Sequence, residues 1–265
     1  MILDTILDRK RMEIQELLSR FDITETAREV AKLPPARDFK QAIHRAGGVA
    51  LIAEIKKKSP SKGILCESFD HLRLARVYRD NGAAAVSVLT DAPFFGGRPE
   101  YLTEVRQEID LPLLRKDFII HPVQLYQSRL LGADAVLLIA AALSDAELVQ
   151  LLGLSLELGL QALMEVHSEE ELFRVVKANP TLIGINNRNL HTFQTDLNTT
   201  SRLMEHLIGS GITVVSESGI GNFEDIRRLK AMGVQAALVG EAIVTAPDIG
   251  FKVQELVKGG ETLVL

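Results

Sequence analysis

Short apolar runs alternate with amphipathic segments along most of this chain. The runs lie near residues 50–56, 84–89, 112–117, 135–140, 161–166, 182–187, 213–217 and 236–240. Segments between them, such as residues 169–176, carry apolar residues at helical spacing. Parallel strands need crossover connections of this kind, so the alternation predicts a parallel sheet covered by helices. Eight repeated strand-helix units predict an α/β fold of the closed (β/α)₈ kind, a TIM barrel.

Two helical segments are expected before the first strand. The first covers residues 2–20, where apolar side chains recur at helical spacing, and Pro34–Pro35 ends this region. The second covers residues 38–43, ends at Gly47–Gly48 and is expected to plug or flank the barrel. We therefore predict a single TIM-barrel domain over residues 1–265, with a helical extension at 1–47, the barrel at 48–257 and a tail at 258–265.

Glycines support the closed barrel over an open doubly wound sheet. Five helices are expected to stop at a glycine, at Asn81–Gly82, Leu131–Gly132, Leu158–Gly159, Ser210–Gly211 and Met232–Gly233. An open sheet usually shows a dinucleotide fingerprint after its first strand. The Gly219–Ile220–Gly221 run instead follows the seventh expected strand and has Glu224 where a third small residue belongs.

Length and charge narrow the protein class. Barrels of this kind typically take about 250 residues, so the 265 residues leave little for a second domain. A net charge of -5 disfavours a surface built for nucleic acid or anionic lipid. The single cysteine, Cys66, fits a reducing cytosol, and residues 1–10 lack the apolar core of a signal peptide. We expect a cytoplasmic protein without membrane contact, and we make no prediction of its oligomeric state.

Ionisable residues stand at the ends of four of the apolar runs. Glu54 and Lys56 close the first run, and Lys116, Glu165 and Glu217 close three others. Burying an unpaired charge costs several kcal/mol or more, so a purely structural role for the whole set is disfavoured, although any single pair could be a structural ion bridge. Because enzymes of this fold keep their active sites at the carboxyl ends of the strands, these side chains predict a catalytic mouth.

Strand alternation sorts further side chains by face. Asn186 and Arg188 share one face, and His167 shares a face with Glu165, whereas Asn187 should point to the helices. A structural role is favoured for His121 and His167. A solvated loop is favoured for the further lysines, Lys57, Lys58 and Lys62.

Two late strand ends predict a phosphate site. The runs Glu217–Gly221 and Val239–Ala242 bring glycines to the loops after the seventh and eighth strands, where barrels of this kind bind phosphate through backbone N–H groups. Turn glycine explains either run alone about as well. The histidines lack metal-binding spacing, so no metal is expected, and Cys66 has no histidine nearby in sequence to activate it.

Several ordered motifs resemble those of the indole-3-glycerol phosphate synthase family. The resemblance runs from the Ile2–Asp4 helix to about Phe251. It is carried by residues 53–63 (AEIKKKSPSKG), 87–91 (SVLTD), 94–97 (FFGG), 113–118 (LLRKDF), 183–190 (IGINNRNL) and 216–220 (SESGI). It implies a barrel with an extra amino-terminal helical segment and a cofactor-free decarboxylating ring closure on a phosphorylated carboxyphenylamino-deoxyribulose.

The resemblance also implies roles at the matching positions. Lys116 would be the general acid and Glu165 the general base, with Glu54 holding that lysine. Lys56 would be a further cationic substrate contact and could act as a second acid, and Asn186 would orient intermediates.

The remaining positions would bind substrate. Ser59 lies in the loop after the first strand, and Arg188 offers a planar fork to a carboxylate or phosphate. Glu217 and Ser218 would line the pocket. Phosphate would be held by the backbone N–H groups of Gly219, Gly240 and Glu241.

Three positions depart from the family pattern. Arg98–Pro99 follows the FFGG motif where serine is frequent, and Arg115 puts a charge beside the catalytic lysine, expected to face outward. Glu241 stands where some members have serine, and a glutamate side chain cannot donate to phosphate, so its main chain would have to act.

Two other functions compete with the ring closure. A Schiff-base aldolase would use Lys116 as a nucleophile, which requires a depressed pKa and is opposed by a nearby carboxylate. A non-catalytic barrel could bind a phosphorylated metabolite, but such a site needs no paired acid and base.

Overall fold

The computed structural model describes residues 2–44, 48–189 and 194–261. Within them, eight parallel strands close into a barrel in the order β1-β4-β5-β6-β7-β8-β9-β10, which confirms the predicted TIM-barrel fold. The strands are β1 Ala50–Ile55, β4 Ala85–Leu89, β5 Leu113–Lys116, β6 Ala135–Ile139, β7 Gln161–Val166, β8 Leu182–Asn186, β9 Thr213–Glu217 and β10 Ala236–Val239. All eight lie close to the runs expected from the sequence.

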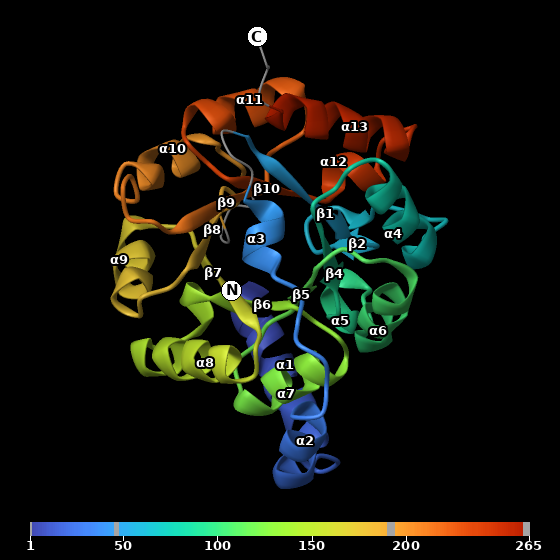
Figure 1. The fold of residues 1–265 in the computed structure, drawn as a ribbon, viewed down its shortest axis with the longest axis vertical. Helices are drawn as coiled ribbons and strands as arrows, with labels where there is room; N and C mark the ends of the chain where they lie inside the picture. The colour runs from blue at the N-terminus through green and yellow to red at the C-terminus, as the bar shows by residue number, and fades with distance from the viewer. Residues whose placement is uncertain (1, 45–47, 190–193, 262–265) are drawn as a thin grey trace.

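Helices surround the ring of strands (Figure 1). They are α4 His71–Asp80, α6 Pro99–Glu108, α7 Pro122–Leu130, α8 Asp145–Glu157, α9 Glu169–Lys177, α10 Asn198–Met204, α11 Phe223–Ala231 and α13 Ile249–Gly260. Two of the expected glycine stops, Gly82 and Gly132, have φ of 92° and 88°. This left-handed backbone is readily reached by glycine and ends each helix at the start of the turn into the next strand.

Strand alternation separates two apolar cores. In β1, Ala50 and Ile52 point into the barrel, whereas Leu51 and Ala53 pack against the helices. Alternate side chains along a strand point to opposite faces, so each strand serves both cores. The barrel interior is thus filled by side chains, and a cavity opens at its carboxyl-end mouth.

Three helices precede the barrel: α1 Ile2–Leu18, α2 Ile23–Val30 and α3 Phe39–Ile43. The helix α3 lies over the centre of the ring of strands, at the amino-terminal end (Figure 1). Phe39 and Ile43 are fully buried in the inner core, and the side chain of Gln161 accepts from the N–H of Lys40 at 2.6 Å. The expected plug is therefore present; it ends at Ile43, and Gly47 lies outside the described residues.

Smaller elements were absent from the sequence expectations. They are α2, the antiparallel pair β2 Lys58–Ser59 and β3 Gly63–Ile64, the helices α5 Ala92–Phe95 and α12 Glu241–Val244, and the 3₁₀ turn Ala140–Ala142. Except for α2, these elements lie in loops at the carboxyl ends of the strands.

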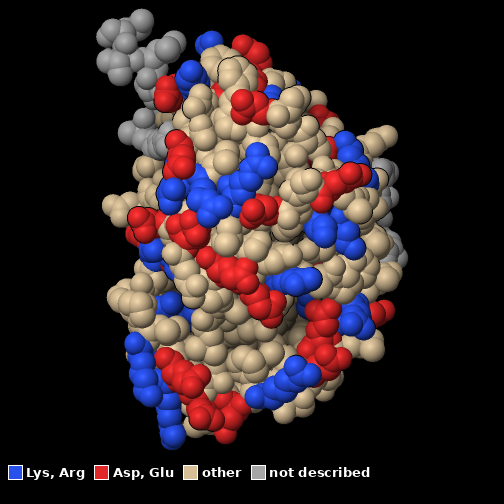
Figure 2. Space-filling view, turned by 90° about the vertical axis from the view of Figure 1, so that its right-hand side faces the viewer, with Lys and Arg blue, Asp and Glu red and all other residues tan. Residues whose placement is uncertain are grey.

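Surface charge is mixed on the face shown in Figure 2, where acidic and basic side chains lie interspersed among neutral ones. None of the helices in the described ranges has the length and apolar character needed to cross a membrane.

Candidate active site

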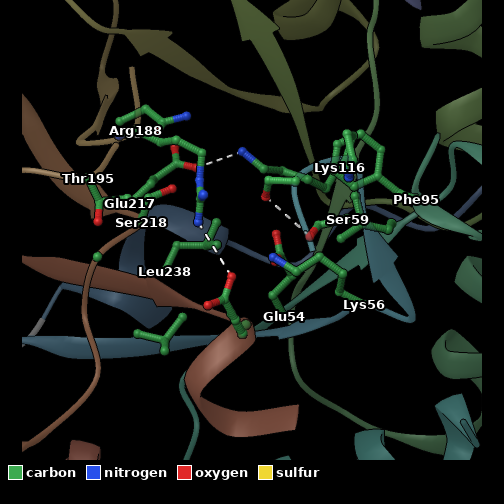
Figure 3. A pocket seen from close by; sticks show the side chains of 18 of the residues that line it. Glu54, Lys56, Ser59, Phe95, Lys116, Arg188, Thr195, Glu217, Ser218 and Leu238 are labelled. Carbon is green, nitrogen blue, oxygen red and sulfur yellow. Dashed lines mark hydrogen bonds and ion pairs between the residues drawn. The ribbon is translucent and has the colours of Figure 1, made fainter. Parts of the chain in front are cut away.

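A cavity of about 550 Å³ opens at the carboxyl ends of the strands. Side chains from separate strand ends converge on it in Figure 3, with Lys116 and Glu217 turned toward each other and Glu54 beside Lys56. Arg188 lies on one side of the cavity and Phe95 on the other. All the site residues proposed from the sequence line this cavity: Glu54, Lys56, Ser59, Lys116, Glu165, Asn186, Arg188, Glu217, Ser218, Gly219, Gly240 and Glu241.

One ammonium and three carboxylates form the floor of the cavity. They are Lys116 on β5, Glu54 on β1, Glu165 on β7 and Glu217 on β9. In the ring order these are alternate strands, which in this fold contribute the side chains of one interior layer. The layers below contain apolar residues, so the uppermost layer concentrates charge in a place largely shielded from water.

Lys116 bridges two of the carboxylates. Its Nζ lies 2.8 Å from Glu165 Oε2 and 2.6 Å from Glu217 Oε2. Burial alone would lower the pKa of Lys116, but the two carboxylates outweigh burial and raise the pKa above its ordinary value. The side chain is therefore an ammonium with a proton to donate.

Glu165 and Glu217 differ although both touch the same ammonium. Burial raises the pKa of each, yet Lys116 and His167 bring the pKa of Glu165 below its ordinary value, whereas the pKa of Glu217 is raised to about 7. Glu165 Oε1 also accepts from Asn186 Nδ2 at 3.2 Å, while Glu217 Oε1 is buried without a hydrogen-bond partner. The carboxylate with more hydrogen-bond and cationic partners keeps the charge, so Glu165 is the ionised member and Glu217 the one that holds a proton more readily.

Glu54 differs from the expectation that it holds Lys116. Its Oε2 lies 2.5 Å from Lys56 Nζ, while the direct partners of Lys116 are Glu165 and Glu217. Glu54 and Lys56 are two residues apart on one strand end and point the same way, so they meet without crossing the barrel. Glu54 acts on Lys116 only as a more distant negative charge.

Asn186 and Arg188 follow one another on the face predicted from alternation. The Oδ1 atom of Asn186 accepts from the N–H of Arg188 at 3.0 Å. Arg188 Nη2 lies 3.5 Å from Glu241 Oε2, and Lys62 Nζ lies 2.5 Å from Glu241 Oε1. Lys62 was assigned to a solvated loop; it is half exposed but joins the rim of the cavity.

The two late loops present backbone to the cavity. Ser218 and Gly219 have φ of 66° and 75°, so two successive residues are left-handed, and such strain in a non-glycine residue is typical of functional sites. Gly240 allows the close approach of Glu54, because a Cβ at residue 240 would collide with that carboxylate. These loops form a concave surface of main-chain groups suited to an anion.

An apolar wall was missed by sequence reasoning. Ile2, Leu3 and Ile6 from α1 line the cavity, together with Phe95 and Phe118, whose ring centroids are 6.0 Å apart. This wall can accept an aromatic ring beside the charged floor.

A buried lysine on α1 is the sequence feature from which the position of this helix at the mouth could have been predicted. Lys10 interrupts the apolar stripe between Ile6 and Ile14 at four-residue spacing, and it lies 2.9 Å from Asp117 Oδ1 and 3.3 Å from Asp91 Oδ2. A lysine on the apolar side of a helix needs a buried carboxylate partner. Both partners follow strand ends, so the pairing holds α1 at the mouth.

The remaining sequence expectations concern residues around the site. Arg115 points away from the barrel interior, as expected, and is buried against Thr90, Ser128 and Asp117. His121 caps α7 by accepting from the N–H of Val123. In the part of the chain that the structure describes, no cluster of three or more His, Cys, Asp or Glu side chains could hold a metal ion.

Comparisons with known protein sequences all give the same family description. A family model described as indole-3-glycerol phosphate synthase matches residues 3–256. A protein of that name from Desulforamulus reducens is 58% identical over 260 residues, covering 98% of each chain. Another from Roseiflexus sp. (strain RS-1) is 49% identical over 262 residues, covering 96% of this chain and 97% of that protein.

Solved structures support the fold alone. A crystal structure of 3-hexulose-6-phosphate synthase superimposes with a TM-score of 0.65 at 15% identity, covering 80% of this chain and all of that chain. Identity this low carries no information about substrate.

Proposed function

This chain belongs to the indole-3-glycerol phosphate synthase family, and on that premise we propose that Lys116 is its general acid and Glu165 its general base. The family activity is that of a carbon-carbon lyase in tryptophan biosynthesis. The enzyme converts 1-(2-carboxyphenylamino)-1-deoxyribulose 5-phosphate to indole-3-glycerol phosphate with loss of carbon dioxide and water. The bridging position of Lys116 between two carboxylates is the observation that carries the assignment of roles.

Ring closure requires a proton at the ketone oxygen. The ring carbon that bears the carboxylate attacks the ketone carbon, and Lys116 protonates the oxygen as it becomes a hydroxyl. Carbon dioxide then leaves, and its bonding electron pair returns to the ring. The raised pKa of Lys116 keeps the ammonium charged until the developing alkoxide, which is more basic than an amine, takes the proton.

Dehydration requires both an acid and a base. The hydroxyl accepts a second proton and leaves as water, and Glu165 takes the proton from the carbon next to nitrogen, so that the new double bond forms. Its ionised state and its contact with Asn186 suit this role. Lys56 is a candidate for a second acid, and Glu217, whose pKa is raised to about 7, is able to exchange a proton with Lys116 at 2.6 Å.

The substrate would be oriented by its two ends. Its phosphate would meet the backbone of Gly219, Gly240 and Glu241, and Ser59 and Ser218 lie on the lining nearby. Its aromatic ring would pack on the apolar wall of Ile2, Leu3, Ile6, Phe95 and Phe118. In this orientation the ketone carbon would lie over Lys116 in the charged floor.

We propose that the reaction needs no cofactor, because side chains of this chain can make each proton transfer. A Schiff-base aldolase is disfavoured, since an amine nucleophile must be unprotonated and the pKa of Lys116 is raised. A cytoplasmic location remains a prediction, supported by the single free cysteine.

The decisive assay follows indole fluorescence after addition of substrate, without added metal or nucleotide. Wild-type protein should form product, and Lys116→Met should lower kcat at least about a thousandfold because the acid is lost, while circular dichroism still shows a folded barrel. Thermal unfolding should move to lower temperature, because Glu165 and Glu217 lose the buried ammonium between them. Lys177→Met, at an exposed lysine of α9, is the matched control and should keep wild-type rates. Near-normal turnover by Lys116→Met would remove the proposed acid.

A further inference from the structure

We propose that His167 is a positioning residue for Glu165, holding the carboxylate of the general base from behind the cavity. The inference rests on the proposed role of Glu165. His167 follows β7 and shares the face of Glu165, two residues earlier. Its Nε2 lies 3.4 Å from Glu165 Oε1 and has no hydrogen-bond partner, although the atom is buried.

The other ring nitrogen of His167 also faces a carboxylate. Its Nδ1 lies 3.2 Å from Glu171 Oε2, and the same oxygen accepts from the backbone N–H of His167 at 2.7 Å. The first turn of α9 fixes Glu171, because its own N–H donates to Ser168 Oγ, the cap of that helix. The imidazole is thus anchored to a helix none of whose residues lines the cavity.

Two carboxylates define the protonation state of the ring. A neutral imidazole donates from one nitrogen and accepts at the other, so it would meet one of these acceptors with a lone pair. An imidazolium presents a positively charged N–H to both, at 3.2 Å from Glu171 and 3.4 Å from Glu165. Burial opposes the charge, but Glu171 and Glu165 outweigh burial and raise the pKa of His167.

The charged groups around Glu165 come from several elements. Lys116 from β5 holds Oε2, Asn186 from β8 donates to Oε1, and His167 approaches Oε1 from the end of β7. Glu217 from β9 adds negative charge nearby. With His167 in place, each oxygen of the base faces a cation, so the carboxylate stays ionised and its orientation toward the substrate is fixed.

A purely structural role for His167 would not require its contact with Glu165. Capping of α9 needs only the contacts of Glu171 with the backbone and Nδ1 of His167. The buried contact of His167 Nε2 with Glu165 adds nothing to that cap. Through this contact His167 can affect catalysis.

Two substitutions separate the two contacts. His167→Asn places an amide about where Nδ1 lies, so it keeps a donor toward Glu171 and loses the group facing Glu165. His167→Gln places an amide about where Nε2 lies, so it keeps a donor toward Glu165 but loses the charge. We expect kcat to fall about tenfold or more in His167→Asn and less in His167→Gln, with KM within about twofold of wild type, because general-base catalysis is typically worth about a hundredfold to ten-thousandfold and only part is lost.

The pH profile is the readout that a structural role would not change. Removing a cation beside Glu165 raises the pKa of that carboxyl, so the acid limb of kcat against pH should move to higher pH in both variants. His71→Asn is the matched control, because His71 also pairs with a glutamate, Glu104, and neither residue lines the cavity. It should keep the wild-type profile.

The outcomes distinguish a failure of the proposed role of His167 from a failure of the proposed role of Glu165 as the base. Glu165→Gln should be inactive. If it is, and both His167 variants fold but keep the wild-type kcat and acid limb, the inference is wrong. If Glu165→Gln itself turns over normally, the assignment of the base has failed. A His167→Asn variant that does not fold leaves His167→Gln to decide, since a shifted acid limb there supports the inference and an unchanged one overturns it.

Discussion

Lys116 has two direct carboxylate partners, Glu165 and Glu217, whereas sequence reasoning expected Glu54 to hold it. Alternation shows which face a side chain takes, but the partner across a barrel depends on which strands contribute to one layer. Lys116, Glu165 and Glu217 are brought together because β5, β7 and β9 alternate in the ring. Glu54, which belongs to the same layer, is instead neutralised by Lys56, its neighbour on the same strand end.

Glu241 is the residue at which this chain departs most clearly from a simple phosphate site. Its carboxylate is paired with Lys62 and Arg188 on the rim, close to the backbone groups proposed to bind phosphate. Burial would raise the pKa of Glu241, but Lys62 outweighs it and keeps the group ionised. At the proposed phosphate site, an incoming phosphate would meet the negative charge of this carboxylate.

Glu241→Gln should bind anions more tightly than wild type. Removal of the negative charge ends its repulsion of an anion at the rim and takes away the ion-pair partner of Lys62, so the inhibition constant of inorganic phosphate should fall by about three- to tenfold, with a larger effect at low ionic strength. Steady-state inhibition at two salt concentrations measures this. Glu157→Gln, at an exposed glutamate of α8, is the control. An unchanged or higher inhibition constant would show that Glu241 does not oppose the anion.

Among the elements, the strands of the barrel and the helices that cover it could be predicted from sequence because each carries its own signal. A buried parallel strand is a short apolar run, and glycine at residues 82 and 132 marks where a helix must stop. The pair β2–β3 and the helices α5 and α12 span two to four residues each, too short to establish a period. Their shapes depend on contacts across the mouth, such as Lys58 Nζ with the carbonyl of Pro93 at 2.7 Å.

The helix α1 shows how a long element can be predicted while its position is not. The helical spacing of its apolar residues is clear in the sequence. Its place over the mouth depends on the contacts of Lys10 with Asp117 and Asp91, which follow strands far from α1 in the sequence. Burial would lower the pKa of Lys10, and the two carboxylates outweigh it and raise that pKa. The helix and two strand ends are thus joined by one buried ammonium.

Lys10→Met should loosen α1 and weaken substrate binding. The change leaves the carboxylates of Asp91 and Asp117 without the ammonium, and breaking a buried ion pair in this way costs about 3 to 5 kcal/mol of the free energy of unfolding. Because Ile2, Leu3 and Ile6 belong to the same helix, KM should rise several-fold, with a smaller change in kcat. Urea unfolding and steady-state kinetics measure the two effects. Arg11→Met removes an exposed cation of α1 and should change neither.

At the scale of the whole molecule, the barrel is closed at one end and charged at the other. The helix α3 seals the amino-terminal end with Phe39 and Ile43, and the inner core fills the middle. The carboxyl end holds the ammonium of Lys116 between two carboxylates, with a third, Glu54, paired to Lys56 beside them. A rigid, well-packed scaffold can support such an uppermost layer, although the burial of so much negative charge lowers the stability of the fold.

Glu217→Gln should reveal this cost through its dependence on pH. Burial raises the pKa of Glu217 to about 7, above the value of about 4.3 for a free glutamate. A group of this kind contributes stability that is present below its unfolded pKa and is lost as the pH rises through its folded pKa. Glutamine does not titrate, so the stability of the variant relative to wild type should rise between pH 5 and pH 8, by up to about 2 to 3 kcal/mol. Urea unfolding at the two pH values measures the difference, and Glu157→Gln should show the wild-type dependence. Equal differences at both pH values would mean that Glu217 titrates as an ordinary carboxyl and that the barrel does not pay for its charged layer in stability.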